Sequence, residues 1–524
     1  MEQPSLLRQG FGRQALLSLL RERDPASPAI VCEGKTLSIG ELLRDTELLA
    51  EGFQQAGMKA GDTAVLAAMP DAGFVCIVYA AMICGLRLAV IDPEMGRDNY
   101  REKLKQLQPQ WAFVDYRLLF LQEHPLIRWA YFQGSKKGIY FPRSPGVKTI
   151  ATGGWMPIFQ KHIPFGKLMA RNSSDDFKSQ GAPQLEERDF LITYTSGTTS
   201  MPKGVVHSVG AITASILQIA DLIRGGHNRR IATHLPYFAI IGLNAGVTAY
   251  LWEYRLSATG QIDFIEKNQI TTLFSPPCDY LRLIEYCERE GKFFPECLQH
   301  LFFGSAPVHR SFLERLMAVL PEHVRLTCLY GMTENLVVAS IDGREKAMLP
   351  TASGDILGRP VPGVEIQIAA DGEILVRSPQ TYTRYLHFDK RDDWHASGDL
   401  GFLDSEGRIV LTGRKKDMII RRNFNLYPGL YEPTINRIPG VTECAFVGVF
   451  DETKHDETVA LFVETHRPVS ETAFKKQLER GEFSIDREAL PDLIFFEKLP
   501  RAGRQNKVDK NALRERLRQS FPKV

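Results

Sequence analysis

The segment Leu191–Gly204, LITYTSGTTSMPKG, decides how the rest of the chain is interpreted. The apolar run Phe190–Tyr194 at its start is typical of a buried strand. The strand leads into a loop in which five hydroxyl-bearing residues accompany one glycine: Thr195, Ser196, Gly197, Thr198, Thr199 and Ser200. Such a loop offers backbone N–H and side-chain O–H donors with little bulk, which suits the closely spaced oxygens of a polyphosphate.

A second interpretation of this loop is a polar surface turn between a strand and a helix that begins near Ser208. The loop is not a Walker A motif, because no G-x-x-x-x-G-K-[ST] pattern fits it. Lys203, between Pro202 and Gly204, adds a cation beside a rigid turn and a flexible point. The choice between the two interpretations therefore depends on the rest of the chain.

The composition is that of a globular protein with more than one domain. The chain has 524 residues, of which 44% are hydrophobic and 24% charged. The 64 Lys and Arg residues nearly balance the 62 Asp and Glu residues, and this net charge of +2 gives no support to a nucleic-acid partner. The eight cysteines form no C-x-x-C pair and no zinc-binding spacing, so we expect free thiols in a reducing compartment.

The N-terminal sequence MEQPSLLRQGFGRQ lacks the apolar stretch of a signal peptide. The most apolar segment, Ala72–Cys84, is too short to span a bilayer. We therefore expect a cytoplasmic protein.

The order of the predicted elements indicates an α/β fold. Strands expected at Asp62–Ala68, Leu86–Ile91 and Gln110–Val114 alternate with helices expected at Ile39–Ala56 and Ala72–Cys84, which is typical of a doubly wound, mostly parallel sheet. The alternation resumes after the hydroxyl-rich loop. Strands are then expected at Arg230–His234, Thr271–Phe274, Leu301–Phe303 and Val324–Tyr330, and helices near Gly210–Leu222, Leu243–Tyr250, Asp279–Cys287 and His309–Val319.

The pattern changes after Gly358. Alternating apolar residues on both sides of Asp371-Gly372, and a second turn at Glu406-Gly407, predict antiparallel hairpins. A compact βαβ-like unit follows. We therefore predict a large N-terminal domain at residues 1–413, with a β-barrel-like antiparallel subdomain at about 355–413, and a small C-terminal α+β domain at residues 414–524.

The stretch from His124 to Ser174 contains no Asp or Glu but is rich in aromatic and basic residues, such as Trp129, Tyr140 and Arg143. We expect an excursion that packs on the main body. The alternative is peripheral contact with a membrane through residues 124–174, because basic residues interleaved with aromatic ones suit an anionic interface.

Five further motifs follow the loop in the chain. Together with the loop they resemble, in the same order, the signatures of the adenylate-forming superfamily, which includes acyl-CoA synthetases, luciferases and peptide-synthetase adenylation domains. The resemblance covers nearly the whole chain. The sequence departs from the family pattern at Ser200 and at Asn506, where glycine is usual. The five motifs are LFFGSAP at Leu301–Pro307, YGMTE at Tyr330–Glu334, SGD at Ser397–Asp399, GRKKD at Gly413–Asp417 and NKVD at Asn506–Asp509.

The resemblance implies a role in ATP binding for each motif. The hydroxyl-rich loop and Lys203 would hold the β- and γ-phosphates. Gly304, Ser305, Ala306 and Pro307 would form a wall for the adenine, on which Tyr330 would stack beside Gly331 and Met332. Thr333 would contact the α-phosphate, and Glu334 would hold Mg²⁺, which neutralises the repulsion between an attacking carboxylate and the phosphates. Asp399 would bind the ribose hydroxyls, and Arg414 would contact ribose or phosphate.

The same resemblance implies that the C-terminal domain is mobile, with Lys416 as its hinge residue. Lys507 would bridge the substrate carboxylate and the phosphate, with Lys510 as the alternative because Asn506 departs from the pattern. Taken singly, each motif also has a structural explanation. Glu334 could be a first-turn carboxylate of a helix, and the basic residues near Arg414 and Lys507 could be solvated surface.

The segment His234–Gly242, HLPYFAIIG, resembles a family motif that often ends in an aromatic residue and histidine. Ala239 occupies the gate position, where a small residue would admit a bulky or long acyl chain. We therefore expect a substrate pocket lined by Tyr237, Phe238, Ala239 and Gly242, although a core helix explains the same apolar run. Ala239 and Asn506 also resemble the β-lactone synthetases of bacterial olefin biosynthesis.

The resemblance implies ATP-dependent activation of a carboxylic acid, expected to be a fatty or other hydrophobic acid, to acyl-AMP with release of pyrophosphate. The acyl group would then pass to a thiol, and coenzyme A is the expected acceptor. Two alternatives are the phosphopantetheine arm of a carrier protein and intramolecular capture as a β-lactone. A third is a non-catalytic nucleotide- or acyl-binding protein, which the presence of Glu334 and Lys507 disfavours.

Overall fold

The chain forms two compact units, which are described separately. The first contains Met1–Phe274, Met332–Val337 and Ser378–Asp392, and the second contains Ser275–Gly331, Val338–Arg377 and Asp393–Val524. The predicted boundary at Arg414 stays a prediction. The computed structural model describes residues 13–91, 97–124, 146–154, 162–170, 187–194, 203–224, 229–252, 256–350, 354–389, 393–421, 424–451, 456–480, 483, 485, 489–502 and 506–520.

An eight-stranded sheet lies in the first unit, in the order β19-β9-β8-β4-β3-β5-β6-β7. The strands from β8 to β7 in this order pair in parallel, whereas β9 is antiparallel to both β8 and β19. This confirms the predicted α/β class. The strands are β3 (Thr63–Ala67), β4 (Arg87–Val90), β5 (Trp111–Asp115), β6 (Lys148–Thr152), β7 (Ile163–Pro164), β8 (Asp189–Tyr194), β9 (Gly204–Ser208) and β19 (Arg384–Tyr385).

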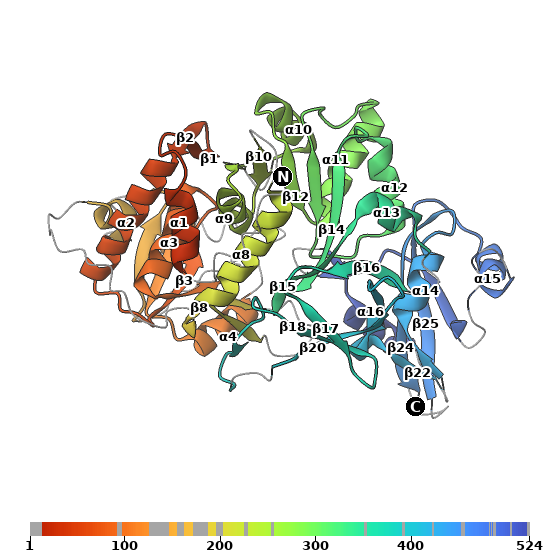
Figure 1. Ribbon diagram of the computed structural model, residues 1–524. Coiled ribbons are helices and arrows are strands. Elements are labelled where there is room, and N and C mark those ends of the chain that lie inside the picture. Colours follow the sequence, from red (N-terminus) through yellow and green to blue (C-terminus); the bar gives the residue numbers. More distant parts are fainter. Residues whose placement is uncertain are drawn as a thin grey trace. The chain divides into compact units, whose positions relative to one another are not determined.

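Helices cover the sheets of the first unit, and α8 and α9 pack against each other (Figure 1). The longest has a capping box, in which Ser38 and Glu41 satisfy each other's free backbone N–H groups. Ser208 caps α8 (Val209–Ile223) with its side chain alone, by accepting from the N–H of Ala211. The helices are α1 (Arg13–Arg21), α2 (Ile39–Gln55), α3 (Ala72–Cys84), α4 (Arg97–Leu107), α5 (Tyr116–Glu123), α7 (Phe165–Leu168), α8 (Val209–Ile223), α9 (Pro236–Asn244) and α10 (Ala258–Lys267).

The first unit also contains the strand order β12-β10-β11-β1-β2. The helix predicted at Leu243–Tyr250 is wrong. The helix begins at Pro236 and ends before Gly246, whose φ of +80° favours glycine and interrupts the helical backbone, and a strand follows. The uninterrupted apolar run hides this change from a periodicity argument. The strands are β1 (Pro28–Cys32), β2 (Lys35–Ser38), β10 (Arg230–Thr233), β11 (Thr248–Leu251) and β12 (Thr272–Ser275).

The second unit contains the strand order β17-β18-β20-β21-β16-β15-β14-β13. The two predicted hairpins are confirmed, with Gly372 and Gly407 at φ of +83° and +72° in their turns. The strands are β13 (His300–Phe303), β14 (Arg325–Met332), β15 (Asn335–Asp342), β16 (Asp355–Pro360), β17 (Glu365–Ile368), β18 (Glu373–Arg377), β20 (His395–Leu403) and β21 (Ile409–Arg414), and the helices are α11 (Pro277–Glu290), α12 (Arg310–Ala318) and α13 (Gly343–Met348).

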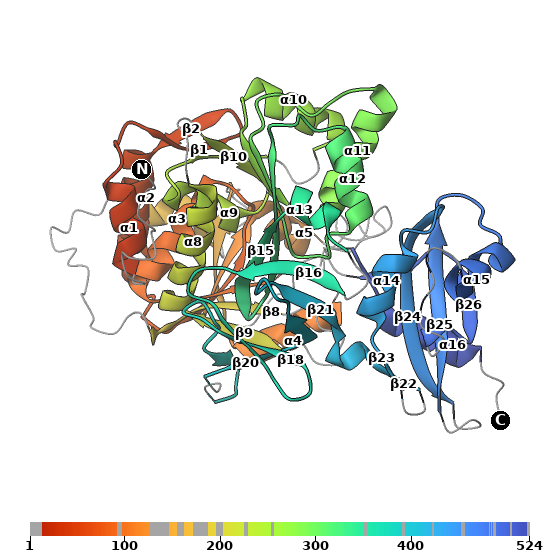
Figure 2. The ribbon, with the colours of Figure 1, turned by 45° about the vertical axis from the view of Figure 1, so that its right-hand side comes forward.

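The C-terminal part of the second unit has a three-stranded sheet in the order β24-β25-β26 (Figure 2). The strands β25 and β26 are parallel and are connected along the chain by a helix, which confirms the predicted βαβ-like unit. A short hairpin precedes this sheet. The elements are β22 (Ile419–Arg421), β23 (Phe424–Leu426), α14 (Pro428–Ile435), β24 (Val441–Asp451), β25 (Asp456–Thr465), α15 (Glu471–Arg480), β26 (Leu493–Phe496), β27 (Arg501–Ala502), β28 (Lys507–Val508) and α16 (Lys510–Gln519).

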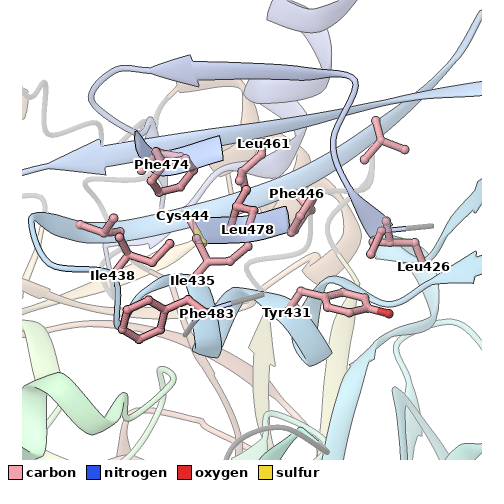
Figure 3. Close-up of a cluster of buried hydrophobic side chains, with 14 of the residues drawn as sticks. Leu426, Tyr431, Ile435, Ile438, Cys444, Phe446, Leu461, Phe474, Leu478 and Phe483 are labelled. Atoms are coloured by element: carbon pink, nitrogen blue, oxygen red, sulfur yellow. The ribbon is translucent and has the colours of Figure 1, made fainter. Parts of the chain in front are cut away.

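Both faces of this small sheet are buried. Alternate residues of β24 point to opposite faces, so that Phe446 joins α14 and α15 in one core, whereas Val447 packs with α16 in another. Figure 3 shows the first core, which contains Phe474 and Leu478 of α15 and Phe446 of β24. A sheet covered on both sides has its own hydrophobic core.

We expect Phe446→Ala to lower the free energy of unfolding by about 3–5 kcal/mol, because the side chain is 0% exposed and its loss leaves a cavity. The matched control is Phe450→Ala on the same strand, where the side chain is 57% exposed, and the expected change is within about 0.5 kcal/mol. Urea unfolding followed by circular dichroism measures both. Equal losses in the two variants would contradict this assignment of the core.

Candidate active site

The hydroxyl-rich loop connects two antiparallel strands of the first unit. Tyr194 at the end of β8 pairs with Gly204 at the start of β9. The strand β9 was not predicted; the predicted helix after it is confirmed as α8. Lys203 is described and exposed. The predicted phosphate-binding residues Thr195, Ser196, Gly197, Thr198 and Thr199, together with Ser200, lie outside the described residues.

Thr333 and Glu334 form the turn between β14 and β15, which excludes the helix first-turn explanation for Glu334. Glu334 Oε1 accepts a hydrogen bond of 2.9 Å from the hydroxyl of Tyr385. The backbone carbonyl of Glu334 accepts one of 2.8 Å from the N–H of Tyr382. The next residue, Asn335, donates to Ser378 and Thr381 at 2.8 and 3.0 Å, respectively. The turn is therefore held by the segment Ser378–Tyr385, which lies about fifty residues further along the chain.

Tyr385 is a site residue that the sequence analysis missed. It pairs with Val205 on β9, the strand that follows the hydroxyl-rich loop. The centroid of its ring lies 5.4 Å from Lys203 Nζ. Burial and the charge of Glu334 raise the pKa of Tyr385, so its hydroxyl stays protonated and donates to the carboxylate. Tyr385 thus connects the predicted metal-binding carboxylate to the end of the phosphate loop. No local pattern marks a single tyrosine on a two-residue strand.

His207 of β9 was also missed. Its side chain is buried and hydrogen-bonds to the backbone of Thr333, whereas its Nδ1 has no partner among the described residues. Burial lowers the pKa of His207 to about 4, so the imidazole is neutral at physiological pH. His207 therefore ties the strand after the loop to the turn that carries Thr333 and Glu334.

Glu334 fits the magnesium role that the resemblance implies. Mg²⁺ in nucleotide sites is bound by one or two carboxylates together with phosphate oxygens and water. Within the described ranges, no group of three or more His, Cys, Asp or Glu side chains could hold a metal by itself. A single carboxylate held by Tyr385 is therefore suited to a metal that arrives with a triphosphate.

The predicted ribose site lies in the second unit. Asp399 of β20 is buried, and its Oδ2 accepts a 2.7 Å hydrogen bond from the hydroxyl of Tyr330. Arg414, its cross-strand partner on β21, places Nε 2.9 Å from Oδ1. This contact is an ion pair without hydrogen-bond alignment, because Oδ1 has no hydrogen-bond partner among the described residues. A buried carboxylate oxygen of this kind suits a hydroxyl donor such as that of ribose.

The predicted adenine wall follows β13. Gly304 is buried, whereas Ser305 and Pro307 are exposed and Ala306 is half-buried. Ser305 has a φ of +68°, which is unusual for a residue with a side chain. Backbone in such a conformation is concentrated at functional sites, where the surrounding structure maintains it. Gly331 and Met332 are the last two residues of β14.

Lys507 lies in a cationic environment within the second unit. Burial is the main cause that lowers its pKa to about 8, and Arg414 and Lys416 act in the same direction, whereas Asp399 opposes them. The alternative residue Lys510 forms a 2.8 Å ion pair with Glu432. The charges of Arg414, Lys416 and Asp399 therefore act on Lys507, whereas Lys510 is engaged elsewhere in the C-terminal part.

The predicted hinge residue Lys416 lies in a short 3-10 helix, Lys415–Asp417, directly after β21. Its neighbour Lys415 pairs with Asp371 at 2.6 Å and with Glu373 at 2.8 Å. On the other side, Asp417 pairs with Arg514 of α16 at 2.8 Å. Lys416 is therefore flanked by one residue tied to the β17–β18 turn and one tied to the C-terminal helix.

The predicted pocket residues Tyr237, Phe238, Ala239 and Gly242 all lie on α9. Phe238 is buried and stacks on Phe274 at 3.4 Å between ring centroids. A Cβ on Gly242 would come within 2.6 Å of the Ile231 side chain, so Gly242 allows the helix to pack on β10. Gly242 thus has a packing role, and Ala239 has no exposed surface.

Most of the predicted membrane-contact stretch lies outside the described residues, which include 146–154 and 162–170 of it. Among the described helices, none is both long and apolar enough to cross a bilayer.

Comparisons with known proteins identify the family of this chain. The sequence profile of the family described as AMP-binding enzyme matches residues 19–386. An indoleacetate–CoA ligase from Aromatoleum aromaticum is 28% identical over 517 residues, which cover 94% of this chain and 95% of that protein. An olefin β-lactone synthetase from Xanthomonas campestris is 28% identical over 522 residues, which cover 88% of each chain.

Among solved structures, the o-succinylbenzoate coenzyme A synthetase from Bacillus subtilis in complex with ATP and magnesium ion superposes with a TM-score of 0.73. The identity is 21%, and the match covers 95% of this chain and 98% of that chain, which shows that the fold is shared. The family profile spans well over half of the sequence and includes the loop, the Tyr330–Glu334 motif and Tyr385. The chain therefore belongs to the AMP-binding enzyme family, the adenylate-forming superfamily that its ordered motifs resemble.

Proposed function

We propose that this enzyme uses ATP to activate a carboxylic acid as acyl-AMP and then transfers the acyl group to a thiol. The observation that carries this proposal is the environment of Lys507. Among the residues that the structure describes, the cations Arg414 and Lys416 act on its amine, and the anion Asp399 opposes them. Such a cluster is stabilised when an anion enters it, and the electrostatic stabilisation of developing negative charge is often the largest catalytic term.

In the first half-reaction, a carboxylate oxygen of the acid attacks the α-phosphorus of ATP. A C–O–P linkage forms between the acid and the α-phosphorus. The bond between the α-phosphorus and the oxygen that bridges to the β-phosphate breaks, and pyrophosphate leaves with that oxygen. Lys507 would stabilise the charge on the carboxylate and α-phosphate oxygens. Thr333 would contact the α-phosphate, and Glu334 would hold the magnesium that accompanies the phosphates. His207 and Tyr385 would keep this turn in position.

In the second half-reaction, a thiol attacks the acyl carbon and AMP leaves. The segment after Lys416 would rotate, withdraw Lys507 and admit the thiol. Coenzyme A is the acceptor we favour, since the indoleacetate relative is a CoA ligase. The domain boundary at Arg414 is part of this proposal. The apolar sequence of helix α9, most of which is buried, supports a hydrophobic acid, fatty or aromatic.

We expect Lys507→Ala to abolish carboxylate-dependent pyrophosphate exchange and to spare thioester formation from supplied acyl-AMP. The reason is that the ammonium group acts on the charges of the first half-reaction, and the second half-reaction takes place after it has moved away. Isotopic pyrophosphate exchange and product chromatography measure the two steps. Equal survival of both steps would show that Lys507 lacks this role.

The first half-reaction should also depend on pH through Lys507. Burial lowers the pKa of this amine to about 8, so the charged form predominates below that pH and is lost above it. We expect kcat/KM for pyrophosphate exchange to fall by about tenfold per pH unit above this value. In Lys507→Arg, whose guanidinium stays charged, this alkaline limb should move to higher pH. An alkaline limb that is identical in both enzymes would assign the titration to another group.

The thiol acceptor and the acid can be identified together. The enzyme is incubated with ATP, a β-hydroxy fatty acid and either coenzyme A or none, and the products are analysed by mass spectrometry. We expect an acyl-CoA in the first case and acyl-AMP in the second. A β-lactone in both cases would favour the olefin β-lactone relative, and the absence of any ATP-to-AMP turnover over a panel of fatty, aryl and amino acids would favour a non-catalytic binding protein.

A further inference from the structure

The lysine expected to act in the first half-reaction is presented by a short hairpin. In this hairpin β27 pairs with β28, so that Arg501 lies opposite Val508 and Ala502 opposite Lys507. Asn506, directly before Lys507, has a φ of +52°, a left-handed conformation that asparagine tolerates better than most residues with a side chain. The direction of the chain that carries Lys507 therefore depends on the backbone conformation of Asn506.

Arg501 connects this hairpin to two carboxylates. Glu443 of β24 and Glu464 of β25 are directly opposite each other in the register of the sheet, where like charges repel. Arg501 Nη1 lies 2.6 Å from Glu443 Oε2, and its Nη2 lies 2.9 Å from Glu464 Oε2. The side chains of Arg501, Glu443 and Glu464 are 22%, 24% and 19% exposed, so water screens these charges only in part.

The same guanidinium also reaches the turn. Its Nη1 donates to the backbone carbonyl of Asn506 at 3.4 Å. On the other side of the hairpin, Glu464 Oε2 accepts from the N–H of Leu499 at 3.2 Å. The guanidinium of Arg501 thus connects β24, β25 and the backbone carbonyl of the residue before Lys507. Its N–H donors are fixed in one plane and point in different directions, whereas the ammonium group of a lysine is a single compact charge.

Glu443 extends this arrangement toward the predicted adenine wall. Its Oε1 lies 4.0 Å from Nε2 of His309, and His309 comes two residues after Pro307. The carboxylate that holds Arg501 is therefore placed beside the segment that precedes α12. If these charges served only to join β24 and β25, neither the contact between Glu443 and His309 nor the hydrogen bond from Arg501 to Asn506 would be needed.

We propose that Arg501 is the positioning residue of Lys507: it neutralises Glu443 and Glu464 and fixes the backbone at Asn506, from which Lys507 would reach the nucleotide. This inference rests on the proposed function of Lys507. It predicts a defect confined to the half-reaction in which Lys507 takes part, since a displacement of about 1 Å of a catalytic group can cost on the order of 100-fold in rate.

The test compares Arg501→Met, Arg501→Lys and the control Arg516→Met. Arg516 lies in the same C-terminal part and pairs with Glu497. For Arg501→Met we expect kcat of pyrophosphate exchange to fall by about 100-fold, with KM for ATP within about twofold and thioester formation from supplied acyl-AMP retained. Arg501→Lys should recover part of the rate, because it restores the charge but not the fork. Arg516→Met should behave as the unaltered enzyme.

Removal of Arg501 leaves two uncompensated carboxylates, so folding is measured in parallel by thermal unfolding. The triple variant Arg501→Met, Glu443→Gln, Glu464→Gln removes this repulsion and should regain thermal stability without regaining pyrophosphate exchange. If the triple variant regains both, Arg501 has a structural role and the proposal is wrong. If Lys507→Ala keeps full exchange, the proposed function of Lys507 fails, and the positioning role fails with it. If Lys507→Ala loses exchange and Arg501→Met does not, only the positioning role fails.

Discussion

The buried carboxylate of Asp399 is the group on which the predicted ribose site of the second unit depends. It accepts a hydrogen bond from Tyr330, forms an ion pair with Arg414 and lies close enough to affect Lys507. A buried carboxylate is costly without partners, and here the partners come from the end of a strand, a cross-strand neighbour and the C-terminal hairpin. The groups that would hold the ribose are therefore also those that set the charge around the predicted catalytic lysine.

The turn that carries Glu334, in the first unit, depends on a different constraint. In its proposed role Glu334 would have to stay available to a metal, and its turn is held by groups that contact its backbone or a single carboxylate oxygen. His207 and Tyr382 hold the backbone of the turn, and Tyr385 donates to the carboxylate. A neutral imidazole and a protonated phenol can hold an anionic corner without neutralising it, which keeps the negative charge of Glu334 for a cation.

The C-terminal part combines hydrophobic cores on both faces of its sheet with ion pairs near Lys416 and Lys507. Its sheet is buried on both faces, so Lys507 is carried by a body with hydrophobic cores of its own. Asp417, next to the predicted hinge residue, is tied to the helix that follows Lys507. Burial of the carboxylate opposes the low pKa of Asp417, but the cations Lys510 and Arg514 hold it below its ordinary value. Stiffness between hinge and lysine is what a rotation would need in order to move the lysine as one piece.

The sequence by itself determined the α/β class, the hairpins at Asp371-Gly372 and Glu406-Gly407, and the order of the family motifs. These features depend on residues close together in the chain, because turn residues and the period of apolar side chains act locally. The same local signals failed where the apolar run around Gly242 has no period, and the strand β11 was taken for a helix. They also gave no indication of β9, which needs β8 and β19 as partners.

Only the tertiary structure decided which side chains share a charge or a hydrogen bond. Tyr385 meets Glu334, Arg501 meets Glu443 and Glu464, and burial brings the pKa of Lys507 to about 8. The physical reason is that desolvation and the direction of a hydrogen bond depend on atoms from distant parts of the chain, and these are brought together only when the sheets and their helices pack.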